Sequence, residues 1–136
     1  MPGPASNVMP HVVVVIPVRD RARMVQDAIA SVLAQSYRDY ALVVVDDGSS
    51  DGSAAAAEAV LAGASVPAVV LRQPARGVAA ARNAGVAATV SPWVAFLDSD
   101  DLWLPHKLER QMAWLETRPA YRIAQTEERW IEIATL

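Results

Sequence analysis

The sequence has no cysteine, which excludes a disulfide framework, a thiolate metal site and a cysteine nucleophile. It also lacks a strong charge of either sign, since 12 basic and 15 acidic residues leave a formal net charge of −3 at pH 7. A chain with this balance offers no basic surface for nucleic acid, so we expect no nucleic-acid partner. The function therefore belongs to a class that needs neither thiol chemistry nor a basic binding surface.

Long hydrophobic runs are absent as well. The apolar run at residues 12–18 is interrupted by Pro17, is followed by Arg19, and is too short to span a membrane. The preceding residues 1–10 (MPGPASNVMP) are proline-rich and do not have the layout of a signal peptide, so we predict a flexible tail. We expect no transmembrane segment and a cytoplasmic location, with the inner face of the membrane as an alternative site of action.

The 136 residues, of which 53% are hydrophobic and 20% charged, are enough for one globular domain with a core. Continuous β-branched runs, typical of strands buried on both faces, alternate with helical patterns. Strands are predicted at 12–16, 41–45, 67–71 and 93–97, and helices at 20–33, 54–62, 77–90 and 105–115. We expect Asp20, then Ser50 or Asp51, to cap the first two helices, and Pro105 to lie in the first turn of the last. This order predicts an α/β fold with a mostly parallel sheet between two layers of helices.

Acidic residues follow three of the four predicted strands. They are Asp20 after the first strand, Asp46 and Asp47 after the second, and Asp98, Asp100 and Asp101 after the fourth. The carboxyl ends of parallel strands share one edge of the sheet, where α/β proteins bind ligands. Because gathered carboxylates repel one another, they indicate a bound cation and a polar ligand.

Several familiar α/β proteins do not fit. A dinucleotide-binding fold needs glycines directly after the first strand, but that loop reads PVRDR at residues 17–21. No phosphate-binding motif G-x-x-x-x-G-K-[ST] occurs. A response-regulator receiver needs an aspartate after the third strand, which here ends in LRQP at residues 71–74. A nucleotidyltransferase would need a glycine-rich basic loop after the first strand, which is also absent.

Five ordered motifs resemble the opening of a family-2 glycosyltransferase of the GT-A fold. They are residues 16–21 (IPVRDR), 31–37 (SVLAQSY), 45–53 (VDDGSSDGS), 77–85 (GVAAARNAG) and 96–105 (FLDSDDLWLP). A lone D-x-D motif is weak evidence, but five motifs in the right order are a strong signal. The resemblance implies a Rossmann-like, nucleotide-sugar-binding domain over residues 11–118 and an inverting transfer of the sugar.

The resemblance also implies roles for individual residues. Pro17, Val18 and Arg19 would border the nucleobase, and Asp47 would accept a hydrogen bond from it, with uracil the usual base. The D-x-D motif, Asp98, Ser99 and Asp100, would lie along the ribose and diphosphate. Asp100 would ligate Mg²⁺ or Mn²⁺, with Asp98 at the ribose or reaching the metal through water. Arg76 and Arg82 would add positive charge beside the diphosphate.

Each of these residues also has a plainer interpretation. Asp46 and Asp47 could cap a turn, and Arg82 with Asn83 could brace the edge of the sheet. His11 and His106 are typical of surface or cap positions, and Trp103 and Trp114 of packing.

The catalytic base is not assigned. An inverting transferase needs a carboxylate that deprotonates the acceptor hydroxyl, and in the resembled family it lies far beyond the D-x-D motif. Glu127 is a formal candidate that comes early for this role. Residues 119–136 are predicted to open an incomplete acceptor-side region, so the chain would be the donor half of an enzyme. The alternative is a non-catalytic nucleotide-sugar-binding module or inactive fragment, and the acceptor (saccharide, lipid or protein) is unknown. Apolar Trp130, Ile131 and Ile133 predict self-association through an exposed patch.

Overall fold

The computed structural model describes residues 10–124 as four strands alternating with four helices. The elements are β1 (Val12–Val18), α1 (Ala22–Leu33), β2 (Tyr40–Asp47), α2 (Ser53–Leu61), β3 (Ala68–Gln73), α3 (Val78–Ala87), β4 (Trp93–Phe96) and α4 (Lys107–Glu116). All pairings are parallel, in the order β3-β2-β1-β4. The predicted α/β fold with a parallel sheet is confirmed.

Two stretches lie outside the described residues, namely 1–9 and 125–136. Most of the predicted proline-rich tail falls in the first stretch. Glu127, Trp130, Ile131 and Ile133 fall in the second, so the predictions about them stay predictions. Within the described part, no helix is long and apolar enough to cross a membrane.

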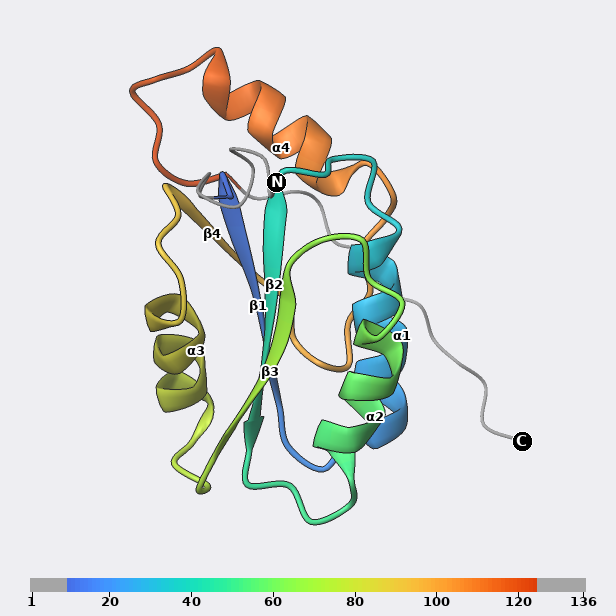
Figure 1. Ribbon diagram of the computed structural model, residues 1–136. Coiled ribbons are helices and arrows are strands. Elements are labelled where there is room, and N and C mark those ends of the chain that lie inside the picture. The colour runs from blue at the N-terminus through green and yellow to red at the C-terminus, as the bar shows by residue number, and fades with distance from the viewer. Residues whose placement is uncertain (1–9, 125–136) are drawn as a thin grey trace, which may run out of the picture.

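The sheet lies between two layers of helices (Figure 1). Helices α1 and α2 cover one face and α3 covers the other, while α4 lies beyond the amino end of the sheet. Every residue of β1 is buried because both faces are covered. Val12, Val14 and Ile16 pack in the core beneath α1, and Val13 and Val15 pack in the core beneath α3. This two-sided burial is why β1 reads as an unbroken apolar run rather than an alternating one.

Helix α3 lies close to the sheet because small residues face it. Ala81 is fully buried, and Gly85 lies directly over Val15. A Cβ at Gly85 would be 2.4 Å from Val15 Cγ1, so no larger residue fits without displacing the strand or the helix. Close packing through small residues therefore holds α3 against the sheet.

Strands β1 and β4 separate at the carboxyl edge of the sheet. Pairing between β1 and β4 stops at Val15 and Phe96, whereas pairing with β2 continues through Val18. Val15 O accepts a hydrogen bond from Leu97 N at 3.1 Å, so Val15 and, two residues later, Pro17 face β4. Pro17 has no N–H to donate, and it lies where β4 has already left the sheet. The strands thus diverge where the acidic loops begin.

The predicted cap residues are wrong in detail. The N-cap of α1 is Arg21 rather than Asp20, which instead takes a left-handed conformation with φ 53°. The N-cap of α2 is Gly52 rather than Ser50 or Asp51. The carboxylate of Asp20 instead bonds Ser50 of the facing loop. Asp51 lies one residue before the N-cap, and its carboxylate bonds both Ser53 N at the start of α2 and Ala22 N at the start of α1.

The start of α4 also differs from the prediction. The helix begins at Lys107, so Pro105 precedes its first turn. Pro105 O instead accepts the hydrogen bond from Ser36 N at 2.9 Å and joins the loop to the end of α1. A contact between distant segments therefore sets this boundary.

Candidate functional site

Two loops at the carboxyl edge are bonded to each other and form a fixed frame. The first follows β1 and the second joins β2 to α2. Five hydrogen bonds join them: Asp20 N to Ser49 Oγ at 2.9 Å, Ser50 N and Ser50 Oγ to Asp20 Oδ1 at 2.7 and 3.3 Å, Arg21 N to Ser53 Oγ at 3.0 Å, and Ala22 N to Asp51 Oδ2 at 3.1 Å. Serines and aspartates suit this task because their short side chains readily bond nearby backbone groups. The polar residues of the segment 45–53 thus fix the positions of the two loops at the carboxyl edge of the sheet.

Asp47 is a buried acid of this edge that accepts three hydrogen bonds. It is 4% exposed, and its Oδ1 accepts bonds from Arg76 N at 2.8 Å and Gln73 Nε2 at 2.9 Å. Its Oδ2 accepts a bond from Gly77 N at 3.0 Å, at the N-terminus of α3. The Arg76 and Gln73 hydrogen bonds, with the Gly77 bond and the Arg19 charge adding to them, hold the pKa of Asp47 below its ordinary value. Asp47 is therefore a carboxylate that anchors the loop before α3.

A glycine allows the loops around Asp47 to meet. Gly48 has φ 71°, a conformation that favours glycine. A Cβ there would lie 2.7 Å from Ala75 N, which no side chain tolerates. The glycine of the D-D-G-S sequence is therefore required both by its dihedral angle and by the close approach of the β3–α3 loop.

The variant Asp47→Asn is expected to be less stable by about 1–2 kcal/mol at neutral pH, because an amide replaces one accepting oxygen with a donor. The pKa of Asp47 is lower in the folded state than its ordinary value of 3.8, so its carboxylate stabilises the folded state at pH values above 3.8. This stabilisation is lost as the pH falls from 3.8 through the lowered pKa of the folded state. The stabilities of the variant and the wild type should therefore converge in acid. Urea unfolding followed by circular dichroism at neutral pH and at about pH 3 measures both effects.

Asp27→Asn is the matched control, because Asp27 is an exposed acid of α1. It should change stability little at any pH. If the stability difference between Asp47→Asn and the wild type did not shrink in acid, the hydrogen bonds to Asp47 would not be the source of the effect.

Asp46 is buried beside Asp47 and points to the opposite face, because successive side chains of a strand alternate. It is 6% exposed, and its Oδ1 has no hydrogen-bond partner among residues 10–124. Its backbone pairs in register with Val18 of β1. The end of β2 therefore concentrates two carboxylates at the edge of the sheet.

The loop after β4 carries the acidic triplet, defined as Asp98, Asp100 and Asp101. One carboxylate oxygen from each lies within 4.8 Å of the others, and all three residues are exposed. Ser99 between them is buried. Oxygen donors of this kind suit a hard divalent cation, so the donor set fits Mg²⁺ or Mn²⁺. The triplet lies just beyond the point where β1 and β4 separate.

Two arginines pair with this triplet. Arg21, at the start of α1, places Nη1 3.0 Å from Asp100 Oδ2. Arg82 of α3 places Nη2 3.0 Å from Asp98 Oδ1, and its guanidinium also stands 5.9 Å from the centre of the Phe96 ring. The positive charge expected from Arg82 is thus next to the D-x-D motif.

The segment after the triplet is tied to α1. Gln35, which is 2% exposed, donates from Nε2 to Leu104 O at 2.7 Å and accepts at Oε1 from Leu108 N at 3.0 Å. Ser31 Oγ accepts from Trp103 N at 3.1 Å. The polar residues of the segment 31–37 therefore have a structural role. Their hydrogen bonds fix the chain directly downstream of the acidic triplet.

The structure refines several predicted roles. Pro17 and Val18 are buried strand residues, so contact with a ligand would fall to their backbone. Arg76 is exposed, and its backbone N–H bonds Asp47. Trp103 is buried, which agrees with packing, and His106 is exposed, which agrees with a surface position.

Arg21 and Gln73 are not among the site residues predicted from the sequence. Arg21 directly follows Asp20 in the acidic loop after the first strand, a position that could have drawn attention to it. No signal in the sequence marked Gln73.

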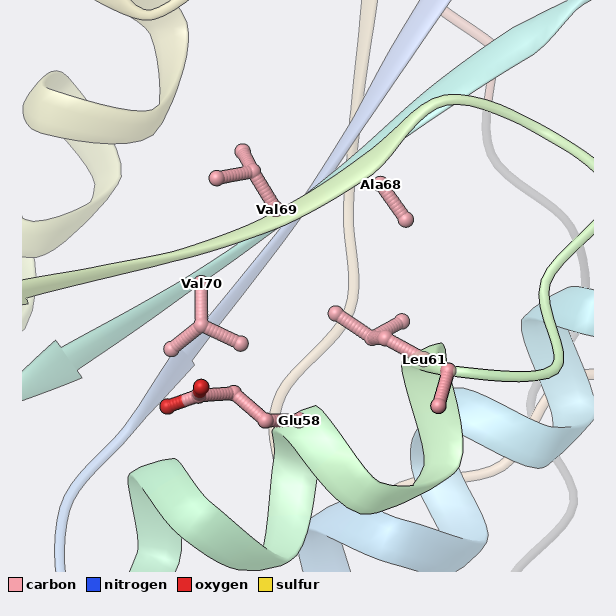
Figure 2. Close-up of a pocket in the computed structure, with 6 residues that line it drawn as sticks. Glu58, Leu61, Ala68, Val69 and Val70 are labelled. Atoms are coloured by element: carbon pink, nitrogen blue, oxygen red, sulfur yellow. The ribbon is translucent and has the colours of Figure 1, made fainter.

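An open hollow lies away from this edge, between α2 and β3 (Figure 2). It is lined by Glu58, Leu61, Ala62, Ala68, Val69 and Val70. Its lining is mostly aliphatic, and the Glu58 carboxylate is already paired with Arg72. The hollow therefore does not offer the oxygen ligands found at the carboxyl edge.

Several known proteins are similar to this chain in sequence and in fold. An uncharacterized glycosyltransferase of Nostoc sp. is 43% identical over 96 residues, which are 71% of this chain and 30% of that protein. The Escherichia coli protein UDP-Glc:alpha-D-GlcNAc-diphosphoundecaprenol beta-1,3-glucosyltransferase WfgD is 33% identical over 102 residues, 75% of this chain and 40% of that protein. The mannosyltransferase PcManGT of Pyrobaculum calidifontis, solved with GDP-Man and Mn²⁺, gives a TM-score of 0.73 at 25% identity, covering 79% of this chain and 33% of that chain.

This chain thus spans less than half the length of the proteins it matches. The profile of the family described as "Glycosyl transferase family 2" matches residues 13–129, which is most of the sequence. The acidic carboxyl edge, the parallel α/β sheet and this match agree with one another. The chain therefore belongs to glycosyl transferase family 2.

Proposed function

We propose that this chain binds a nucleoside diphosphate sugar, with UDP as the nucleotide, through a divalent cation at its carboxyl edge. It would serve as the donor side of an inverting sugar transfer to an acceptor not yet known. The observation that carries the proposal is the acidic triplet beside two arginines at the point where β1 and β4 separate. A divalent cation and guanidinium groups both bind the oxygens of a diphosphate. The acidic triplet could hold the cation, and Arg21 and Arg82 supply guanidinium groups beside it.

The nucleobase would lie between the end of β1 and Asp47. Arg19 directly follows β1, and its positive charge contributes to the lowered pKa of Asp47. Asp47 Oδ1 already accepts two hydrogen bonds, whereas Oδ2 accepts one from Gly77 N. Since a carboxylate oxygen has two lone pairs, Oδ2 can accept a further bond from the imide N–H of uracil.

The diphosphate would lie along the D-x-D motif. Asp100 would hold the cation, with Asp98 supporting it or bonding the ribose, and Arg82 would add positive charge beside the phosphates. The cation would supply electrostatic stabilisation of the diphosphate leaving group. Two observations support these roles: the guanidinium of Arg82 pairs with Asp98, and the backbone N–H of Arg76 bonds Asp47.

Binding without transfer is the second candidate function. The base that would deprotonate the acceptor is unassigned, and Glu127, the formal candidate, lies outside the described residues. The matched regions cover only 30% and 40% of the Nostoc and Escherichia coli relatives, so transfer is a proposal for a whole protein of that kind. A donor-hydrolysis or transfer assay separates the two candidates.

Isothermal titration calorimetry with UDP and MnCl₂ tests the proposal. We expect saturable binding of UDP in the presence of Mn²⁺ and its loss when EDTA removes the metal. GDP is the comparison ligand and should bind more weakly, because guanine does not match the site proposed for uracil. If neither nucleotide bound at any Mn²⁺ concentration, the proposed function would be wrong.

A further inference from the structure

The pairing of Asp100 with Arg21 is exposed and therefore exchangeable. The side chains of Arg21 and Asp100 are 45% and 43% exposed, and ion pairs in such positions contribute little to stability. The same carboxylate is the group through which we propose that a cation binds. Arg21 pairs with the Oδ2 atom of Asp100, so a divalent cation bound to the same carboxylate would lie close to the guanidinium, and the two positive groups repel each other.

The backbone of Arg21 is anchored by a hydrogen bond to a buried side chain, whereas its side chain forms the exposed ion pair with Asp100. Its N–H donates to Ser53 Oγ, and the residues on either side of it bond the β2–α2 loop. Ser53 is fully buried, so this anchor belongs to the rigid frame of the edge. The long arginine side chain can therefore change partners within the site while its Cα stays fixed.

We propose that Arg21 is an exchangeable counter-ion of Asp100, an inference that rests on the proposed function. Without metal, its guanidinium neutralises Asp100 and holds the acidic loop against the start of α1. When a divalent cation and a nucleotide diphosphate bind, the guanidinium leaves Asp100 and pairs with the diphosphate oxygens. Metal alone must compete with Arg21 and binds weakly, whereas metal with nucleotide gives Arg21 a new partner and binds tightly.

The variant Arg21→Gln separates the two stages of this exchange. Titration of Mn²⁺ alone, followed by electron paramagnetic resonance of the free ion, should show an affinity about 2- to 5-fold higher than in the wild type. Calorimetry with UDP at saturating Mn²⁺ should show an affinity about 5- to 10-fold lower, because a charge-assisted contact to the diphosphate is lost. The opposite signs of the two changes are the signature of the exchange.

Arg23→Gln is the matched control. Arg23 is an exposed residue of the same helix with the same charge, and it makes no ion pair with any residue from 10 to 124. It should leave both affinities within about a factor of two, which excludes a general effect of net charge.

Equal Mn²⁺ affinity in the wild type and Arg21→Gln would overturn the inference, as would the same change in Arg21→Gln and Arg23→Gln. A gain in Mn²⁺ affinity with no loss of UDP affinity would overturn the second stage. If the wild type failed to bind UDP while Arg21→Gln still gained Mn²⁺ affinity, the proposed function would fail and the pairing of Arg21 with Asp100 would stand.

Discussion

In the variant Asp100→Asn, the affinity for UDP in the presence of Mn²⁺ is expected to fall at least about 100-fold. Loss of a group that only supports a metal ligand typically costs 10- to 100-fold in metal affinity, so loss of the ligand itself should cost no less. The amide also removes the negative charge that both the cation and Arg21 use. Calorimetry with UDP at fixed Mn²⁺ measures the change.

The fold should survive this substitution, because Asp100 is exposed and its ion pair is on the surface. Circular dichroism should therefore give nearly the same unfolding midpoint as the wild type. Asp27→Asn again serves as the control, since it removes one exposed acid from α1 and should bind UDP normally. Mn²⁺-dependent UDP binding that persisted in Asp100→Asn at wild-type strength would remove Asp100 from the proposed metal site.

Replacing Gln35 by leucine is expected to lower the free energy of unfolding by about 3 kcal/mol. The amide of Gln35 bonds Leu104 O, Leu108 N and Ser31 O from a nearly fully buried position. Leucine has a similar size but offers neither donor nor acceptor. Leu108 N would lose its buried partner, at about 1–3 kcal/mol, and the part-buried bonds to Leu104 O and Ser31 O would be lost at about 1 kcal/mol each. Urea unfolding measures the loss.

Gln26→Leu is the matched substitution, because Gln26 lies on the same helix and donates one bond, to Ala56 O at 3.0 Å. Its loss should cost about 1 kcal/mol. The larger effect at Gln35 would show that this residue holds the chain after the acidic triplet. Equal effects at both positions would mean that α1 is stabilised without any special hold on that segment.

The predictions for Asp100 and Gln35 both concern the segment between β4 and α4. Asp100 supplies the charge that a cation would use, whereas Gln35 fixes the backbone a few residues later. A folded Gln35→Leu variant should therefore also bind UDP less tightly, because an oriented carboxylate binds a cation better than a mobile one. The segment 31–37 would thus support the proposed site by holding the chain that follows the acidic triplet.

The order of elements and the position of the acidic edge were predictable from the sequence. The β-branched run at Val12–Ile16 and the apolar run ending at Asp46 can be buried only in a sheet covered on both faces. Parallel connections then bring Asp47 and Asp100 to the same edge, whatever their separation in the chain. Small residues such as Gly85 likewise indicated that α3 packs closely on the sheet.

The partners of those residues were decided only by the tertiary structure. Asp20 is a good helix cap by composition, yet its carboxylate bonds Ser50 because the facing loop lies nearer than its own helix. Arg21 pairs with Asp100 across nearly eighty residues of chain, and Gln73 bonds Asp47 from the neighbouring strand. Local preferences and periodicity fix which residues are buried and which edge they approach. Hydrogen bonds and ion pairs between loops depend on where several chain segments end in space, which no local pattern encodes.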